Sequence, residues 1–499
     1  MNKILFFNPR SANFTFRIPN SILSIAATVE GAIEWAIVDG NRETDPLDKL
    51  LKYLETNEFK YVGFTAMPGP QLKQAIPFAK AIKERFPETI MIWGGYFPSN
   101  QYKVTLDSGY VDFVINGPGE HAFPSLIQAL ESGASYEEIP NLIFRQEGKI
   151  VKTRKETLFE QDPLPPIPYD TLGRYYSMEG YLGKTYLGER TAAYHSSIGC
   201  PFTCSFCAVV PIYEARWKAK SAPLVYKDIL YLHDRWGADA VEFHDNNFFV
   251  SEKRTVEFAR LVRPLKMQWW GMARIDTMTG FKDESLALIR ESGCRMIFFG
   301  AESGNDAILK QFDKGGTQTG KQIKEFAARM KKFDIIPEYS FVLGAPAATP
   351  EAVESQIQFD INYIRQIKDI NPNTEIVVYI YSPVPTEGSE LWAQAQAQGF
   401  SFPKDLEDWV EPEWERFNLR KNPLTPWLDE KRTGMIRDFE TVLNGVYPTV
   451  SDIRLNNVKR HLLKLIASWR YKAHFYQYPY EIRFLQKAWR YRQPEIQGF

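Results

Sequence analysis

Apolar runs alternate with amphipathic stretches along residues 1–130 of the chain. The stretch Gln71–Phe86, for example, is apolar at helical spacing. The runs between such stretches are short and continuously apolar, as in buried strands. Five of them qualify: Lys3–Pro9, Glu34–Gly40, Tyr61–Ala66, Ile90–Gly95 and Asp112–Gly117. Because buried strands joined by helices form a parallel sheet covered on both faces, residues 1–135 are predicted to form a doubly wound, Rossmann-like α/β domain.

Small residues follow the ends of the fourth and fifth predicted strands. Ligands of doubly wound domains bind outside the carboxyl ends of the strands, and glycine lets the backbone approach a bulky ligand. The candidate ligand-binding positions at these two strand ends are therefore Gly94, Gly95, Gly117, Gly119 and Glu120.

The alternation of strands and helices stops at residues 136–190. The segment Glu160–Tyr176 contains four prolines, which favour an extended tie over a separate core. We therefore predict that 136–190 is a proline-rich connector between two domains.

Strand and helix signals alternate again from residue 191 to residue 385. The strand candidates are Thr191–Gly199, Ala240–Phe248, Gln268–Ile275, Arg295–Ser303, Pro337–Ala345 and Glu375–Pro383. The helical segments between them are Leu224–Trp236, Arg254–Leu265, Asp283–Glu291, Lys321–Phe333 and Pro350–Ile367. Six strand–helix units predict a partial barrel, smaller than the eight-unit barrel of ~250 residues, with its site at the carboxyl ends of the strands.

Residues 386–499 have weaker periodicity and are predicted to be mostly helical. From Ile453 to Gln493 there are ten lysines and arginines, one glutamate and nine aromatic residues. Such a basic, aromatic tail is either a helical cap on the barrel or a surface for peripheral membrane contact. Nucleic-acid binding is the least favoured interpretation, because 60 basic and 61 acidic residues give the chain a net charge of −1.

The apolar runs also bear on the compartment. The run Ile4–Phe7 is shorter than the ~7–15 apolar residues of a secretory signal, and no run approaches the ~20 of a membrane span. We therefore expect a cytoplasmic protein, membrane-associated only if the tail makes such contact. In a reducing compartment, clustered cysteines indicate metal binding or catalysis rather than disulfides.

Three of the four cysteines lie within eight residues, after the first predicted barrel strand. If Cys200, Cys204 and Cys207 each bind one iron of a four-iron cluster, the fourth iron is open, which indicates substrate or cofactor coordination. A zinc site with His195 as fourth ligand is the alternative, although the second ligand pair of structural zinc sites is missing. Cys294 stands alone and is expected to be a small buried apolar residue.

The Cys-x3-Cys-x2-Cys spacing, with Phe206 just before the last cysteine, resembles the radical S-adenosylmethionine (SAM) superfamily. The resemblance implies that the cysteines bind a 4Fe–4S cluster whose fourth iron is chelated by the amino and carboxylate groups of SAM. It also implies reductive cleavage of SAM to a 5′-deoxyadenosyl radical, with an electron donor such as flavodoxin or ferredoxin. The core of the superfamily is a partial six-unit barrel, in agreement with the strand count.

Other positions are similar to looser motifs of the superfamily, each at the end of a predicted strand. By this resemblance Glu302 would reach the ribose hydroxyls of SAM, Gly344 would lie by the adenine, and Arg274 would pair with the methionyl carboxylate. Taken singly, the same residues could be a solvated carboxylate, a turn glycine and a surface ion pair.

One motif departs from the superfamily pattern. Many members carry a Gly-Gly-Glu stretch that meets the methionyl amine, whereas Phe243–Phe248 reads Phe-His-Asp-Asn-Asn-Phe. The resemblance then implies that Asp245 or backbone carbonyls take that role.

The N-terminal domain resembles the cobalamin-binding domain of the cobalamin-dependent radical SAM branch, in the stretches Val62–Ser99 and Val111–Leu130. Another type of cobalamin domain holds cobalt with the histidine of an Asp-x-His-x-x-Gly motif. That motif is absent here, and no histidine precedes His121. The resemblance implies base-off cobalamin without a histidine ligand, with Thr65 and Met67 in the turn beneath the corrin. Whether Met67 or water faces cobalt stays open, and a domain that binds nothing is the alternative.

Together the resemblances imply a cobalamin-dependent radical SAM enzyme that methylates an unactivated carbon. One SAM would methylate cobalamin, and a second would be cleaved to the radical that takes a substrate hydrogen. The abundance of aromatic residues and the tail favour a hydrophobic small-molecule substrate, while the catalytic side chains stay unknown. Two alternatives are a radical cyclase or oxidative rearrangement enzyme without methyl transfer, as in anaerobic magnesium-protoporphyrin ester cyclase, and a non-catalytic cobalamin or iron–sulfur sensor.

Overall fold

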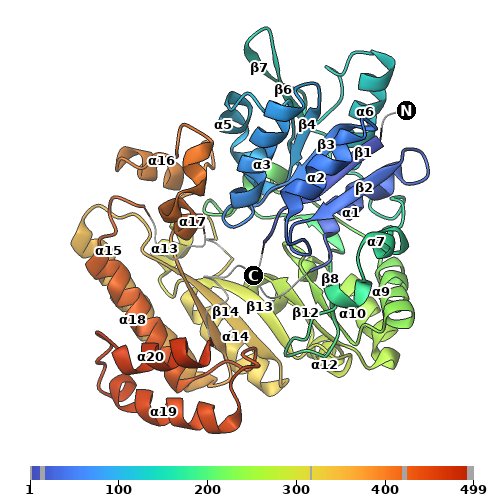
Figure 1. The fold of residues 1–499 in the computed structure, drawn as a ribbon. Helices are drawn as coiled ribbons and strands as arrows, with labels where there is room; N and C mark the ends of the chain where they lie inside the picture. Colours follow the sequence, from blue (N-terminus) through green and yellow to red (C-terminus); the bar gives the residue numbers. More distant parts are fainter. Residues whose placement is uncertain (1–2, 12–16, 315–316, 419–423, 492–499) are drawn as a thin grey trace.

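The structure is a computed structural model that describes residues 3–11, 17–314, 317–418 and 424–491. It contains an N-terminal α/β domain, a second parallel sheet with helices outside it, and a helical C-terminal region (Figure 1). The predicted fold class is confirmed in all three parts.

The N-terminal sheet has the strand order β2-β1-β3-β4-β5 with parallel pairing throughout these five strands. They are the five predicted strands: β1 (Lys3–Asn8), β2 (Trp35–Asp39), β3 (Phe59–Thr65), β4 (Ile90–Gly94) and β5 (Phe113–Ile115). The helices between and after them are α1 (Asn20–Val29), α2 (Pro46–Glu55), α3 (Leu72–Arg85), α4 (Tyr96–Asn100), α5 (Tyr102–Asp107) and α6 (Ala122–Ser132). In this order the chain changes direction between β1 and β3, where doubly wound sheets bind ligands.

Both faces of this sheet are buried, as the continuous apolar runs require. Along β1, Ile4 and Phe6 belong to one hydrophobic cluster, while Leu5 and Phe7 belong to another on the opposite face. Successive strand residues point to opposite faces, so a strand buried on both sides has no polar alternation.

Two strands in the predicted connector were not expected. β6 (Leu142–Gln146) and β7 (Lys149–Lys152) continue the N-terminal sheet in antiparallel pairing beside β5. Their turn, Glu147–Gly148, has positive φ at both positions, which is the geometry of a tight type I′ hairpin. Glu-Gly is a weaker hairpin signal than Asn-Gly, so the turn is hard to recognise in the sequence. The connector continues through α7 (Tyr169–Tyr175) and η1 (Met178–Tyr181), and the domain boundaries themselves stay predictions.

The second sheet has six parallel strands in chain order, as predicted for a partial barrel. They are β8 (Thr191–Tyr194), β11 (Ala240–Phe243), β12 (Gln268–Ala273), β13 (Met296–Glu302), β14 (Ile336–Leu343) and β15 (Glu375–Ile380). The α-helices of this part are α9 (Ala222–Trp236), α10 (Glu252–Val262), α11 (Ile275–Thr279), α12 (Asp283–Glu291), α13 (Asp306–Gln311), α14 (Gly320–Lys332) and α15 (Pro350–Ile370). Two short 3-10 helices, η2 (Phe248–Val250) and η3 (Arg263–Leu265), flank α10.

A short insertion follows β8. The strands β9 (Ser197–Gly199) and β10 (Trp217–Ala219) pair antiparallel, and α8 (Val210–Tyr213) lies between them in the chain. All three predicted cysteine ligands lie in the loop from β9 to α8.

The C-terminal region is helical, as predicted. It contains α16 (Glu390–Ala397), η4 (Glu407–Val410), α17 (Pro412–Asn418), α18 (Glu430–Val446), α19 (Asn457–Lys472) and α20 (Tyr480–Trp489). Trp409 in η4 packs edge-on against Phe97 at 5.0 Å, so this region also covers part of the N-terminal domain. In the described part of the chain no helix is long and apolar enough to cross a membrane.

Candidate functional site

The cysteine loop is tied to the barrel from two sides. The backbone N–H of Ser205 donates to the carbonyl of Phe312 at 3.1 Å, just after α13. The Thr386 hydroxyl, beyond β15, donates to the carbonyl of Ser205 at 2.7 Å. Within the loop, the N–H of Cys207 donates to the carbonyl of Cys204 at 3.1 Å. The loop is therefore held in place by the segments that follow β13 and β15, with Cys204 buried and Cys200 partly exposed.

The arrangement of the cysteines distinguishes a cluster from a single ion. Among the described residues, no group of three His, Cys, Asp or Glu side chains is close enough to hold one metal ion. A structural zinc ion needs four ligands that converge on one point, whereas each thiolate of a 4Fe–4S cluster binds a different iron. His195, the candidate fourth zinc ligand, lies instead beside His244, with ring centroids 6.1 Å apart. The donor set therefore fits an iron–sulfur cluster and gives no support to zinc.

Two cations lie close to the cysteine sulfurs. Burial raises the pKa of the Cys200 thiol to about 11 and also raises that of Cys204, while Arg274 and Lys314 act in the opposite direction on both. Because metal binding requires thiolates, fixed positive charges beside the sulfurs favour the metal-bound form.

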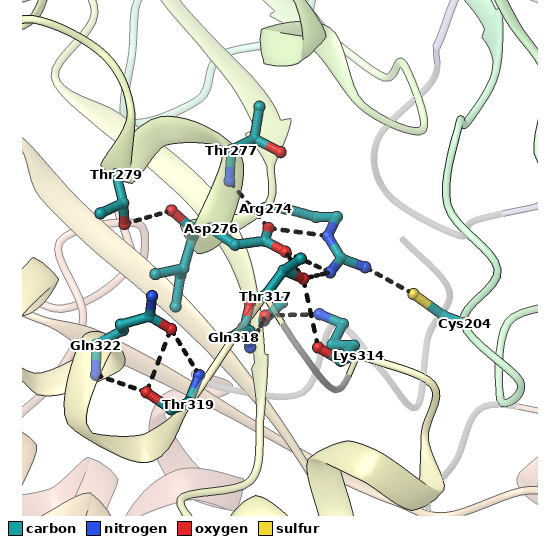
Figure 2. A network of polar contacts seen from close by, with 12 residues as sticks. Cys204, Arg274, Asp276, Thr277, Thr279, Lys314, Thr317, Gln318, Thr319 and Gln322 are labelled. Carbon is teal, nitrogen blue, oxygen red and sulfur yellow. Dashed lines mark hydrogen bonds and ion pairs between the residues drawn. The ribbon is translucent and has the colours of Figure 1, made fainter.

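Arg274, directly after β12, donates a hydrogen bond to a cysteine sulfur (Figure 2). Its Nη1 donates to Cys204 Sγ at 2.9 Å, and its guanidinium lies 3.9 Å from the ring centroid of Phe202. Its Nε and Nη2 donate to the two carboxylate oxygens of Asp276 at 3.0 and 2.6 Å. Burial acts to raise the pKa of Asp276, but the hydrogen bonds and charge of Arg274 lower it. The guanidinium therefore already has a bidentate carboxylate partner.

Glu302 ends β13 at an irregularity in the sheet. The register with β14 shifts between Gly300 and Glu302, and Glu302 has φ +65°. Lys314 Nζ donates to Glu302 Oε1 at 2.9 Å and to the carbonyl of Gly300 at 2.7 Å, and both charged side chains are buried. A bulge of this kind re-aims a strand-end side chain, and here it turns Glu302 toward Lys314.

Asp245 follows β11 and is buried. Its carboxylate accepts hydrogen bonds from the Ser196 N–H at 2.6 Å, the Ser196 hydroxyl at 2.5 Å and the Ser197 hydroxyl at 2.6 Å. Two of these donors belong to Ser196, in the turn between β8 and β9, and the third to Ser197, the first residue of β9. Asp245 therefore fixes the strand that leads into the cysteine loop.

Gly344 and Phe206 make different contacts at this edge. Gly344 follows β14 with φ +84°, and its carbonyl accepts a hydrogen bond from Trp427 Nε1 at 3.0 Å. Phe206 is buried and packs on Phe312, with ring centroids 4.9 Å apart. Phe206 thus anchors the cysteine loop to the barrel, while Gly344 lies against the C-terminal region.

The predicted positions after β3 and β4 come together in the N-terminal domain. Thr65 is buried and accepts a hydrogen bond from the Ser21 hydroxyl at 3.2 Å, whereas Met67 is 44 % exposed. The carbonyl of Gly94 accepts from the N–H of Ala66 at 2.9 Å. Gly95 has φ +101°, and a Cβ there would lie 2.8 Å from the carbonyl oxygen of Ala66. This position therefore requires glycine, and the tight pairing of the two turns leaves Met67 as an exposed side chain.

The turn after β5 faces the cysteine segment. A Cβ at Gly117 would lie 3.7 Å from the carbonyl of Ile212 in α8, and one at Gly119 would lie 2.8 Å from Ile25. Burial raises the pKa of Glu120, and its Oε2 is buried without a hydrogen-bond partner among the described residues. Glu120 is therefore a buried acid with an unsatisfied oxygen at this strand end.

The two strand-end edges meet in the folded chain. Tyr96 in α4 donates from its hydroxyl to Asn246 Oδ1 at 2.7 Å, directly after Asp245 in the barrel. Asn100 Nδ2 donates to the carbonyl of Ala208, the residue after Cys207, at 3.3 Å. The carboxyl edge of the N-terminal sheet is thus in hydrogen-bond contact with the cysteine loop.

Several residues of this edge were not predicted from the sequence. Lys314 and Asp276 are buried charges that pair with predicted residues, and Tyr96 and Asn246 join the two domains. Asp276 lies two residues after Arg274, a spacing that could have suggested the pair. Lys314 lies in a loop between two helices, where no periodicity or motif identifies it.

Comparison with known families agrees with this arrangement. A family model of the B12 binding domain matches residues 17–127, and a model of the radical SAM superfamily matches residues 194–359. The first match includes the glycine turns of the N-terminal domain. The second begins before the three cysteines and ends after Gly344.

Individual proteins are similar to this chain, with their domains in the same order. The uncharacterized methyltransferase PH0819 of Pyrococcus horikoshii is 27 % identical over 76 % of this chain and 78 % of its own length. The anaerobic magnesium-protoporphyrin IX monomethyl ester cyclase of Synechocystis sp. is 26 % identical over 48 % of each chain, so this chain spans about half the length of that relative.

Two solved structures share the fold. The cobalamin-dependent SAM radical enzyme OxsB, with aqua-cobalamin and SAM bound, superposes with a TM-score of 0.71 at 15 % identity, over 98 % of this chain and 75 % of OxsB. The radical SAM methyltransferase TsrM of Kitasatospora setae, with tryptophan and a SAM analogue bound, superposes with a TM-score of 0.64 at 17 % identity, over 84 % of this chain and 83 % of TsrM. The two family matches show a B12 binding domain followed by a radical SAM domain, the arrangement of the cobalamin-dependent radical SAM enzymes to which this chain is similar.

Proposed function

We propose that this chain methylates an unactivated carbon of a hydrophobic small molecule, using a 4Fe–4S cluster, SAM and cobalamin. The observation that carries the proposal is the direct contact between the two carboxyl edges, through Tyr96 with Asn246 and Asn100 with Ala208. When bound, the cluster and SAM would supply a radical at the barrel edge, and cobalamin would supply a methyl group. Contact between the edges favours one substrate position shared by both.

The residues of the cysteine edge fit the proposed ligands, but two of them take other roles than the resemblance implies. Cys200, Cys204 and Cys207 would hold the cluster. Because Arg274 already binds Asp276 through two nitrogens and Cys204 through the third, it fits as a cation beside the thiolates better than as the partner of the methionyl carboxylate. Asp245 has three donors of its own, so we assign it to positioning the loop. Glu302 and Gly344 keep the SAM-binding roles that the resemblance implies.

The N-terminal edge has polar atoms that a bound ligand would satisfy. Asn100 Oδ1, Asn116 Oδ1 and Glu120 Oε2 are buried without a hydrogen-bond partner among the described residues. Buried acceptors of this kind are costly unless a donor reaches them. Cobalamin carries amide groups around its corrin ring, and amide N–H groups are suitable donors. Thr65, Met67 and the glycine turns would lie beside it, with the cobalt free of any histidine ligand.

The barrel interior has aromatic and carboxylate side chains beside one another. Trp269 and Phe299 point outward, where they pack on Phe258 of α10 and Phe326 of α14. Because strand residues alternate, their neighbours Trp270 and Phe298 point into the barrel. Their ring centroids are 6.4 Å apart, and both side chains keep exposed surface. Glu242 is in register with Trp270 and Glu338 with Phe298, and Trp270 Nε1 donates to Glu338 Oε2 at 3.3 Å. Aromatic surface with a few placed polar groups is typical of small-molecule sites, and its aromatic part supports an apolar portion in the substrate.

Anaerobic reconstitution with iron, sulfide and hydroxocobalamin tests the proposal. We expect about four irons per chain, the content of one 4Fe–4S cluster, and stoichiometric cobalt. With a reducing donor such as flavodoxin or ferredoxin and candidate apolar substrates, both S-adenosylhomocysteine and 5′-deoxyadenosine should form. Iron without cobalt would contradict methyl transfer from cobalamin, and zinc without iron would contradict the radical chemistry.

The product pattern distinguishes the two alternatives. A radical cyclase would form 5′-deoxyadenosine without S-adenosylhomocysteine, and the similarity to the protoporphyrin ester cyclase favours testing for it. A sensor would bind cofactors and form neither product. Similarity to a methyltransferase over three quarters of the chain supports methylation over cyclisation.

A further inference from the structure

The helix α19 packs against the protein with one face and leaves most of its opposite face exposed. Asn456 caps its first turn by accepting from the N–H of Lys459 at 2.9 Å. Leu463 and Ala467 are buried on the inner face, where Ala467 lies so close to Gly445 of α18 that a Cβ on that glycine would be 2.7 Å away. The helix lies at the margin of the molecule, far from the N-terminal domain (Figure 1).

The outer face of α19 carries a continuous apolar row. Its members are Val458, Leu462, Leu465 and Trp469, whose exposed fractions are 76, 43, 61 and 53 %. Their spacing of four, three and four residues places them on one side of the helix. Phe475 extends the row by stacking on Trp469, with ring centroids 6.0 Å apart. Contiguous exposed apolar surface of this kind marks an interaction site.

The charges around the row have one sign. Lys464 and Lys472 are exposed and form no ion pair among the described residues. Lys472 follows Trp469 by three residues and borders the row, while Lys464 lies on the flank of the helix. Glu481 is the one acidic residue among described residues 453–491, and its carboxylate pairs with Arg470. The apolar row is therefore bordered by uncompensated positive charge.

These charges distinguish between the partners that could cover the row. A second copy of the chain, packed by the same face, would bring lysines against lysines, which is unfavourable. A bilayer with anionic lipids offers an apolar interior to the row and negative headgroups to the lysines. Trp469, Tyr478 and Tyr480 are exposed aromatic residues of the kind found at membrane–water interfaces.

We propose that the outer face of α19, from Val458 to Lys472, binds the surface of an anionic lipid bilayer. The helix lies in the plane of the interface, with its apolar row among the acyl chains and its lysines at the headgroups. The inference goes beyond the proposed function and does not depend on it, because it concerns attachment and not chemistry. It gives the enzyme a means of working where apolar compounds concentrate.

Vesicle co-sedimentation of the full-length protein tests the inference. The probes are vesicles of phosphatidylcholine alone and of phosphatidylcholine mixed with phosphatidylglycerol. We expect binding to the anionic vesicles, weakened by high salt, and little binding to the neutral ones. Failure to bind anionic vesicles would overturn the inference, as would equal binding to both kinds.

Two variants separate the apolar and electrostatic contributions. Leu462→Gln/Leu465→Gln should weaken binding at least about tenfold, since two apolar side chains leave the acyl region. Lys464→Gln/Lys472→Gln should weaken binding to anionic vesicles by up to roughly 30-fold, about fivefold for each lysine near an anionic surface. All four side chains are exposed, so the fold should be retained, as circular dichroism would verify.

Matched controls use the same substitutions elsewhere. Phe359→Gln removes an exposed apolar side chain from α15, and Lys52→Gln/Lys321→Gln removes two exposed lysines from other helices. Neither should change vesicle binding. If the controls weaken binding as much as the α19 variants, or if the wild type forms dimers that Leu462→Gln/Leu465→Gln abolishes without any vesicle binding, the bilayer is not the partner of this face.

Discussion

The barrel and the N-terminal sheet both present the carboxyl ends of parallel strands, but with different groups. At the barrel edge, charged side chains are buried in pairs, such as Arg274 with Asp276 and Lys314 with Glu302. At the N-terminal edge, tight glycine turns place backbone atoms, and not charged side chains, at the strand ends. Unsatisfied amide and carboxyl oxygens lie beside these turns.

The difference corresponds to the size and charge of what each edge is proposed to hold. A cluster bound by three thiolates has concentrated negative charge, which fixed cations stabilise in a buried site. A corrin is large and mostly uncharged, so it needs space and many hydrogen bonds. Substitutions at one edge should therefore leave binding at the other edge intact, and the predictions below test this independence.

The largest effect is expected at the cysteines. The triple variant Cys200→Ala, Cys204→Ala, Cys207→Ala should lose all cluster iron after anaerobic reconstitution, because each thiolate is one iron ligand. Iron content reports on the barrel edge and cobalt content on the N-terminal edge, and cobalt should be retained. Cys294→Ala is the matched control, since that cysteine is buried away from the loop and should keep full iron. Iron retained in the triple variant would refute the cluster assignment.

Removal of the buried cation beside the cluster should have the next largest effect. Arg274→Gln leaves Asp276 buried without its partner and should lower the free energy of unfolding by roughly 3 kcal/mol. Adding Asp276→Asn should recover part of the loss, because the uncompensated charge is gone. Arg290→Gln breaks an exposed pair with Asp334 and should cost no more than ~1 kcal/mol. Equal losses for Arg274→Gln and Arg290→Gln would show that the buried pair has no special role.

A side chain at Gly95 should affect the N-terminal edge alone. Gly95→Ala places a Cβ against the carbonyl of Ala66 in a left-handed backbone conformation. The strain of ~1–3 kcal/mol should weaken cobalamin binding about tenfold, with iron content unchanged. Gly109→Ala is the control, since that glycine also has positive φ but no atom within 4 Å of the added Cβ. A parallel loss of iron would argue against independent edges.

The smallest effect is a pH dependence at the barrel edge. Asp360 is buried and accepts hydrogen bonds from the Ser303 hydroxyl at 2.9 Å and from the Gly304 N–H at 2.8 Å. Burial nevertheless raises its pKa to about 7. Between the unfolded value near 4 and about 7, the folded state holds a proton that the unfolded state releases, so stability falls as pH rises.

Urea unfolding at two pH values measures this linkage. The free energy of unfolding should fall by about 1 kcal/mol between about pH 6 and pH 7 through Asp360. Asp360→Asn keeps an acceptor for Gly304 and should remove this part of the pH dependence. If the variant and the wild type change equally with pH, Asp360 is already ionised at neutral pH.

Much of the architecture could be predicted from the sequence because local signals report it directly. Every predicted strand of both sheets forms, since continuous apolar runs between amphipathic helices admit few other arrangements. The spacing of Cys200, Cys204 and Cys207 is a local property of one loop. The hairpin β6–β7 escaped prediction because its turn sequence is uncommon and its strands are partly exposed.

The partners of the site residues depended on tertiary structure. The sequence by itself determined the order of the two domains, their strands, and the spacing of the three cysteines, because hydrophobic periodicity and motif spacing are contained in single segments. Only the folded chain decided that Arg274 binds Asp276, that Lys314 reaches Glu302 and that Tyr96 meets Asn246. Such pairs join segments that no local pattern relates, so they arise from the packing of whole elements and not from the residues alone.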